Sequence, residues 1–367
     1  MMPTLTDAVE PTVATPETVG PFGRFWLERL NDPRDLPFAY LIMQCTAVAL
    51  GGIALFFTGA YFWYFAAAYA LVWLNTIDRY ILMLHCTSHI VPFKAKHRVL
   101  NKLVGVILAP FFGQTPMTYF MHHMGMHHPE NNLADDRSTT MPFQRDRLTH
   151  WLRYFGRFIT VGIFDLVRYH FVNRHSKMAR KALFGELSFI VGAVVLGFID
   201  LRATLFVFVG PLVLVRLLMM AGNWAQHAFI DAANPANPYG NSITCINTRY
   251  NRRCFNDGYH IYHHVKPRHH WSQYPAELQK NIATYGEQDA IVIEGYDYFQ
   301  IWLLLMLGRH QAIAKKVVRL PGAPSRTDAE MVSYLKSRLA PVPFVKAHSQ
   351  TSAQLPSTQL PSAQGLS

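Results

Sequence analysis

The chain has 367 residues, of which 50% are hydrophobic and only 16% are charged. This composition and a mean hydropathy of +0.08 exclude a disordered protein and argue against an ordinary soluble globule. Lys and Arg outnumber Asp and Glu by 34 to 23, which gives a net charge of +11. With so much apolar sequence, that charge indicates a membrane surface and not a nucleic acid.

The first 36 residues are polar and rich in Pro and Thr, and we interpret residues 1–36 as an N-terminal arm without a signal-peptide pattern. Four apolar runs that are long enough for membrane helices follow in the chain, at residues 38–58, 61–77, 184–199 and 201–221. Two short breaks, at Gly59–Ala60 and at Asp200, join these runs in pairs. The pattern predicts an all-α integral membrane protein with two transmembrane helical hairpins, four spans in all, in a membrane-embedded domain over residues 37–346.

The apolar run 103–120 is broken by Pro110, Gly113 and Pro116. We expect it to be re-entrant or interfacial because such a broken run does not form a full membrane helix. The segments 151–171 and 296–307 mix aromatic and charged residues and fit helices in the headgroup plane. The repetitive residues 347–367 predict a disordered tail.

Positive charge is strongly asymmetric in this topology. If both ends of the chain lie on one side, 32 of the 34 Lys and Arg residues also fall on that side. The positive-inside rule then places both termini and the large loops in the cytoplasm. Arg216 lies inside the fourth span, where it either meets a substrate carboxylate or extends to the cytoplasmic surface.

Histidine is unusually abundant, with 18 residues, and four clusters lie on the predicted cytoplasmic face. The clusters read HxxxH, HxxxHH, NxxxH and HxxHH, and their members are His85, His89, His123, His127, His128, Asn223, His227, His260, His263 and His264. Residues at i, i+3 and i+4 share one face of an α-helix, so we expect each cluster to direct two or three imidazoles at one point. Nine histidines and one asparagine are too many for one zinc ion and suit two metal ions.

Neighbouring acids are candidates for fixing the orientation of these imidazoles. They are Glu130, Asp135, Asp136, Asp231 and Asp257.

We leave His122 out of the ligand set because it breaks the register of its cluster. His269 and His270 are expected in a loop or near lipid phosphate. The remaining histidines are predicted at the surface, namely His97, His150, His170, His175, His310 and His348.

The order of the four clusters around two hairpins resembles the membrane fatty-acid desaturase superfamily, over about residues 38–271. The resemblance implies a cytoplasmic non-haem di-iron centre with the ten residues above as iron ligands, Asn223 in the place of an amide or water-mediated ligand. It also implies dioxygen as cosubstrate and removal of hydrogen from a fatty acid or fatty-acyl chain. The second cluster has one residue more between its histidines than many acyl desaturases have, which leaves the reaction open. Desaturation, hydroxylation and oxidative decarboxylation to a terminal alkene all remain possible.

The same resemblance implies several partners. No haem-binding HPGG segment occurs, so we expect electrons to come from a separate ferredoxin, rubredoxin or cytochrome, docked on basic residues such as Arg249, Arg252 and Arg253. Anionic lipid headgroups are an equally good interpretation of those arginines.

The alternative of another class is a His-rich metal transporter or sensor. It is disfavoured because transporters place their ligands near the bilayer midplane. A metalloprotease lacks support because no HExxH occurs.

Overall fold

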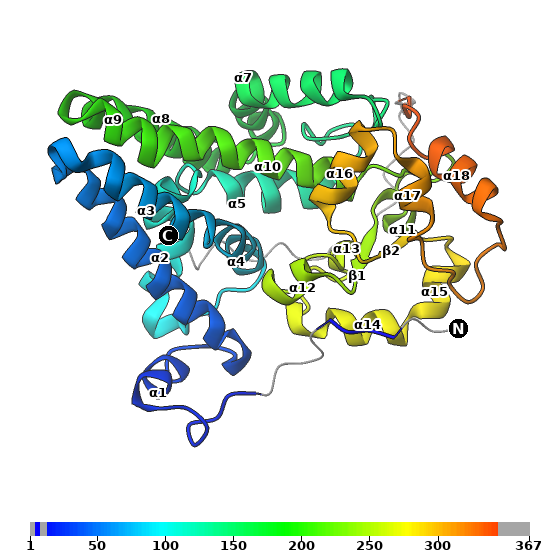
Figure 1. Ribbon diagram of the computed structural model, residues 1–367, viewed down its shortest axis with the longest axis horizontal. Coiled ribbons are helices and arrows are strands. Elements are labelled where there is room, and N and C mark those ends of the chain that lie inside the picture. Colours follow the sequence, from blue (N-terminus) through cyan, green and yellow to red (C-terminus); the bar gives the residue numbers. More distant parts are fainter. Residues whose placement is uncertain (1–3, 8–12, 344–367) are drawn as a thin grey trace.

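The computed structural model describes residues 4–7 and 13–343, and these residues are mostly helical. The long helices extend toward one end of the molecule, and the helices and two strands of residues 238–337 gather at the other end (Figure 1). We call this second region the cap, defined by residues 227–343. The predicted tail 347–367 and His348 lie outside the described residues.

The helices up to the second histidine cluster are α1 (Pro21–Leu27), η1 (Pro33–Asp35), α2 (Leu36–Ala54), η2 (Leu55–Phe57), η3 (Gly59–Tyr61), α3 (Phe62–Leu74), α4 (Ile77–His89), η4 (Ala95–Leu100), η5 (Leu103–Ile107), η6 (Ala109–Phe112), α5 (Thr118–His122), η7 (His123–His127) and α6 (His128–Glu130). The middle of the chain forms α7 (Leu148–Val172), α8 (Ser176–Ile199), α9 (Leu201–Thr204), η8 (Leu205–Val209) and α10 (Gly210–Gln226). Of the η elements, η5, η7 and η8 are π-helical turns.

The cap contains α11 (Pro238–Asn241), β1 (Thr244–Ile246), α12 (Arg249–Arg253), α13 (His260–Val265), η9 (Trp271–Gln273), α14 (Tyr274–Lys280), α15 (Ile282–Glu287), β2 (Val292–Glu294), α16 (Tyr298–Met306), α17 (His310–Ala314) and α18 (Asp328–Ser337). Strands β1 and β2 pair in parallel, with Thr244 opposite Val292. Strand β1 lies shortly before α12 and α13, so its pairing with β2 anchors the start of the segment that carries the fourth cluster.

Three continuous helical segments are long and apolar enough to cross a membrane: Pro33–Phe57, Ser176–Ile199 and Leu201–Gln226. They correspond to the first, third and fourth predicted spans. The second predicted span, 61–77, coincides with the shorter apolar segment Gly59–Leu74, which rises about 24 Å against a hydrocarbon core of about 30 Å. The structure therefore gives three candidate spans, and a membrane span at 61–77 remains a prediction.

The predicted breaks between apolar runs appear as helix ends. Asp200 separates α8 from α9, and its carboxylate caps the new helix by accepting a hydrogen bond from the backbone N–H of Ala203. The run 103–120 forms the short helical pieces η5 and η6 and the start of α5, as its prolines predict. Gly113 turns the chain with a φ of +71°, where an added Cβ would lie 2.3 Å from the carbonyl oxygen of Pro211.

One buried arginine holds much of the cap together. Arg145 is fully buried. Its guanidinium donates hydrogen bonds to several backbone carbonyls, including those of Ala228, Arg338 and Ala340. Burial lowers its pKa to about 9. Because these carbonyls belong to the segments after α10 and α18, Arg145 links the exit of the last candidate span to the far end of the cap.

The N-terminal arm also contacts the cap. The buried carboxylate of Asp7 accepts hydrogen bonds from the backbone N–H groups of Asn247 and Thr248 and from the hydroxyl of Tyr259. Tyr259 directly precedes His260. The arm is therefore anchored at the base of the helix that carries the fourth histidine cluster.

Candidate metal centre

The four histidine clusters come from separate parts of the chain and meet between the long helices and the cap. His85 and His89 lie one turn apart at the end of α4, and His227 directly follows α10. The second cluster lies on η7 and α6, and the fourth lies on α13. The nine histidines form two adjacent groups in which the ligand atoms all lie within 4.8 Å of one another: His85, His89, His123, His128 and His263 in the first group, and His127, His227, His260 and His264 in the second.

In the first group the Nε2 atoms of five imidazoles converge. The Nε2 atom of His263 lies 2.9 Å from Nε2 of His85 and 2.9 Å from Nε2 of His128. The Nε2 atom of His123 lies 2.9 Å from that of His89 and 3.1 Å from that of His128. Convergence of so many imidazole nitrogens on one small volume is compatible with a metal site.

The second group is smaller and adjoins the first. The Nε2 atom of His260 lies 3.3 Å from Nε2 of His227 and 3.0 Å from Nε2 of His264. The rings of His128 and His264, one from each group, have centroids 4.9 Å apart. The two groups therefore form one centre with two positions.

We expected each cluster to direct its imidazoles at one point. This prediction is wrong for two clusters, whose members are divided between the two groups. In the second cluster the cause is the π-turn η7, in which the N–H of His128 bonds to the carbonyl of His123. This i→i+5 bond brings residues five apart to the same side and sends His127 to the other group. In α13, His260 and His264 share a face at i and i+4, while His263 points to the first group.

Hydrogen bonds at the outer ring nitrogens orient several of these imidazoles. The Nδ1 atom of His85 bonds to Asp257 at 2.7 Å, and that of His127 bonds to Asp136 at 2.8 Å. The Nδ1 atom of His227 bonds to the backbone carbonyl of Asn241 at 2.8 Å. Because a carboxylate and a carbonyl only accept, each of these Nδ1 atoms carries the proton and each Nε2 presents a lone pair to the centre.

The same environment keeps the imidazoles neutral. Burial, together with the neighbouring histidines, lowers the pKa well below 6.5 for His89, His123, His128, His260, His263 and His264. Burial lowers the pKa of His227 to about 3. For Asp136 burial opposes ionisation, but His127 and Ser138 outweigh it and lower the pKa to about 2. Neutral imidazoles beside ionised carboxylates are the protonation states that metal binding needs.

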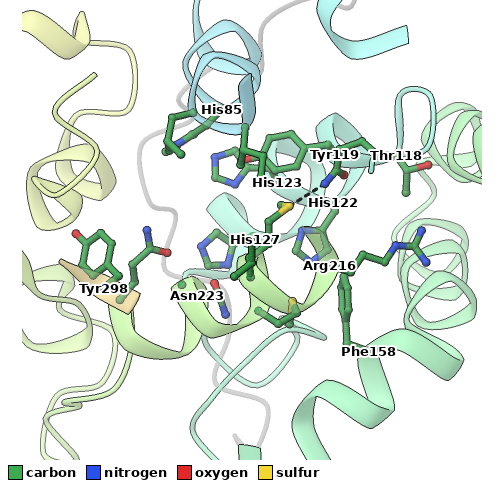
Figure 2. A pocket seen from close by; sticks show the side chains of 18 of the residues that line it. His85, Thr118, Tyr119, His122, His123, His127, Phe158, Arg216, Asn223 and Tyr298 are labelled. Atoms are coloured by element: carbon green, nitrogen blue, oxygen red, sulfur yellow. Dashed lines mark hydrogen bonds between the residues drawn. The ribbon is translucent and has the colours of Figure 1, made fainter. Parts of the chain in front are cut away.

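An apolar cavity of about 400 Å³ adjoins the centre. It is lined by His85, His123, His127 and His260 and by apolar side chains of α4, α7 and α10, among them Ile81, Leu82, Ile163, Leu166 and Met219. Figure 2 shows Arg216, His122 and Phe158 toward one end of this cavity and Tyr298 toward the other. A flexible hydrocarbon chain fits such a space better than a polar substrate does.

Comparison with known families agrees with this geometry. A family model described as "Fatty acid desaturase" matches residues 79–296, more than half of the chain. The chain belongs to the fatty acid desaturase family. The matched region contains all nine histidines and Asn223. No curated protein and no solved structure matches the chain.

Family membership confirms the resemblance seen in the sequence and indicates an oxidoreductase. Together with the three long apolar helices, it also indicates a membrane protein. The large apolar side chains that the helices leave exposed have an explanation in a membrane desaturase. Phe198 on α8 is 89% exposed and Tyr64 on α3 is 79% exposed, and lipid would cover both.

The donor set of this desaturase fits two iron ions. Imidazole nitrogen suits iron, and the two groups offer five and four imidazoles. The buried oxygen atoms that accept hydrogen bonds from Nδ1 fix the orientations of those imidazole rings before a metal binds. The histidine clusters are therefore compatible with a metal site in the position that the family implies.

Asn223 lies at the cavity wall but outside both histidine groups. Its side-chain amide donates hydrogen bonds to the hydroxyl of Tyr154 at 2.7 Å and to the backbone carbonyl of Ser138 at 3.1 Å. These bonds leave its side-chain oxygen as the atom that can face the centre. Its assignment as an amide or water-mediated ligand stays a prediction.

The five acids named as orienting candidates divide into two sets. Asp136 and Asp257 contact ligand histidines, as described above. Three acids have other partners: Glu130 bonds to Tyr169, Asp135 pairs with Arg137 and Asp231 pairs with Arg338. Asp231 misses His227 because α10 ends at Gln226 and does not continue as the shared face requires.

Several other histidines have structural partners. His270 bonds to Asp35 and Ser272, and His269 bonds to the hydroxyl of Tyr262. The prediction of a surface position is wrong for His170, which is fully buried and bonds to the carbonyl of Met121. Gly125 in η7 allows this contact, because an added Cβ there would lie 2.7 Å from the His170 ring.

Sequence reasoning missed two contacts of the centre. The hydroxyl of Tyr274 lies 3.2 Å from Nδ1 of His263, and the carbonyl of Asn241 holds His227. A backbone carbonyl leaves no signal in the sequence. Tyr274 follows the fourth cluster by ten residues and has no spacing that marks it as a partner.

Proposed function

We propose that this desaturase-family protein is an O2-dependent di-iron oxidoreductase that removes hydrogen from a fatty acid or fatty-acyl chain and introduces a double bond. The observation that carries the proposal is the position of two adjacent histidine groups beside one apolar cavity. We assign the nine histidines as iron ligands, with Asn223 as an additional amide or water-mediated ligand.

Bound iron would supply the power to oxidise an unactivated C–H bond with dioxygen. Desaturation converts one CH2–CH2 unit to CH=CH and consumes one O2, two electrons and two protons, with two water molecules as the other product. The electrons require a separate donor of the ferredoxin, rubredoxin or cytochrome type.

The chain's own residues have three tasks in this reaction. Asp257 and Asp136 hold the protons of His85 and His127 at Nδ1, so that Nε2 faces the centre. Ile81 and other apolar side chains of the cavity align the hydrocarbon and exclude water from the oxidant. The π-turn η7 places His123 and His127 in different groups, so one short helix contributes to both metal positions.

We further propose that both termini and the centre face the cytoplasm, in a four-span, multi-pass membrane protein. The concentration of Lys and Arg on one side supports this orientation. Arg253 is a poor candidate for contact with an electron donor because its guanidinium pairs with Asp78. Arg249 and Arg252 remain the better candidates, with membrane lipid as the competing partner.

Oxidative decarboxylation of a free fatty acid is a second candidate reaction, and hydroxylation is a third. Decarboxylation would use one O2, two electrons and two protons, and would release a terminal alkene, carbon dioxide and two water molecules. The guanidinium of Arg216 in the cavity wall favours a substrate with a free carboxylate. A metal transporter or sensor is the alternative of another class.

Mass spectrometry of products from cells that express the protein tests the proposal, with His263→Ala as the matched control. New internal double bonds in the fatty-acid fraction establish a desaturase. A volatile terminal alkene, one carbon shorter than a fed acid, establishes decarboxylation. Purified protein should also contain about two tightly held irons, whereas exchangeable zinc and no oxidised product would contradict the proposal.

A further inference from the structure

Two charged residues face each other between helices that qualify as membrane spans. Arg216 on α10 donates from Nη2 to both carboxylate oxygens of Glu186 on α8, at 3.0 and 2.9 Å. Their side chains are only 16% and 11% exposed. Charged groups at this depth are costly, and such residues commonly mark a substrate path.

The ion pair is incomplete. Among the described residues, Glu186 is the only hydrogen-bond partner of the Arg216 guanidinium, and only Nη2 takes part. The Nη1 and Nε donors are left for a ligand. Because both residues line the cavity beside the histidine centre, a molecule in the cavity can reach these donors.

Two more polar atoms at the cavity wall lack partners. Nε2 of His122 and Oγ1 of Thr115 are buried without a hydrogen bond within the described chain. Figure 2 shows His122 beside Arg216. A buried polar atom without a partner is costly, because neither water nor the protein satisfies its hydrogen bond. A ligand with a polar group at this end of the cavity would remove that cost.

We propose that Arg216, assisted by His122, binds the carboxylate of an unesterified fatty acid inside the cavity. The guanidinium fork matches the two oxygens of a carboxylate, and an ester or thioester does not offer the same negative charge. Glu186 keeps Arg216 paired when no substrate is bound and competes weakly with the substrate for it. This assignment rests on the proposed function, to which it adds the substrate class.

The position of His122 also determines which carbons meet the centre. The ring of His122 lies 6.4 Å from the ring of His127, centroid to centroid. A carboxylate held by His122 and Arg216 therefore brings the carbons next to the carboxyl group to the histidines. Oxidation should occur near the carboxyl end and not in the middle of the chain.

Binding of radiolabelled lauric acid and of methyl laurate to the purified protein in nanodiscs tests this site. Arg216→Gln should weaken laurate binding about tenfold or more and change methyl laurate binding by less than about twofold. Glu186→Gln should strengthen laurate binding, because it removes the competing charge. The control is Arg157→Gln on α7, whose side chain is 55% exposed and pairs with Asp165, and it should change neither affinity.

Unchanged laurate binding in Arg216→Gln, or equal wild-type affinity for acid and ester, overturns the proposal. If Arg216→Gln loses both ligands, the double variant with Glu186→Gln decides, since it leaves no lone buried carboxylate. Restored binding of the ester alone supports the site, and restored binding of both ligands overturns it. Iron content and oxidised products are measured on the same samples. Protein that lacks both but binds laurate through Arg216 contradicts the proposed function and not the binding site.

Discussion

The carboxylate of Asp257 accepts a hydrogen bond from Nδ1 of His85 at 2.7 Å, across 172 residues of sequence. The bond joins the end of α4 to the loop before α13. Asp257 also accepts from the hydroxyl of Tyr250 at 2.6 Å. One carboxylate therefore connects the first and fourth histidine clusters and sets the orientation of a proposed ligand.

Replacing Asp257 with Asn should lower iron affinity by about 10–100-fold, since the amide does not hold the His85 tautomer as a carboxylate does. Competition with a graded iron chelator measures the affinity. Asp135→Asn is the matched control, because the Asp135 side chain is 72% exposed and only pairs with Arg137. Equal affinity in the two variants would show that Asp257 does not act on the metal site.

Replacing a proposed ligand histidine should lower the iron content of the protein, whereas replacing a histidine outside the two groups should not. His263 has Nε2 contacts with both His85 and His128, so His263→Ala removes the middle of the first group. We expect it to lose iron and activity. His269→Ala should keep both, because His269 bonds to Tyr262 and belongs to neither group. Inductively coupled plasma mass spectrometry gives the iron content, and normal iron in His263→Ala would refute the ligand assignment.

The sequence predicts which histidines gather but not how they divide. Cluster spacing and the positions after apolar runs suffice to place nine imidazoles near one another. The π-turn at His123–His127 is not readable from spacing, because a rule for α-helices assumes i→i+4 bonds. The end of α10 at Gln226 likewise removes Asp231 from the centre, although its i+4 position is correct for a continuing helix.

The arrangement of the apolar helices is likewise predictable only in part. Composition and length predict the apolar runs 184–199 and 201–221, which lie inside the longer helical segments Ser176–Ile199 and Leu201–Gln226, and Asp200 marks the turn between them. The second predicted span is different, because the helix ends at Leu74 and a new one starts at Ile77. Trp73 bonds there to the carbonyl of Phe111, a long-range contact that local hydropathy does not contain. The Arg216–Glu186 pair joins two helices, so the spacing of residues along one helix does not predict it either.

A glycine in α8 should be essential for the packing of this helix. An added Cβ at Gly185 would lie 1.9 Å from the backbone carbonyl oxygen of Pro116, which cannot rotate away. Gly185→Ala should therefore destabilise the protein by about 1–3 kcal/mol. The control is Gly192→Ala on the same helix, where an added Cβ has no neighbour within 4 Å. Thermal unfolding in detergent measures both, and equal midpoints would disprove the close contact.

The stability of chelator-stripped protein should fall as the pH drops from about 7 to about 5. Unfolded histidines protonate near pH 6.5, whereas burial holds the pKa of six folded ones well below that value. The unfolded state therefore binds more protons in this interval, and the free energy of unfolding rises with pH. Chemical denaturation at a series of pH values measures the slope. His264→Gln should reduce it, because one buried titrating group is lost, and a flat profile in the wild type would mean that the imidazoles are not held neutral.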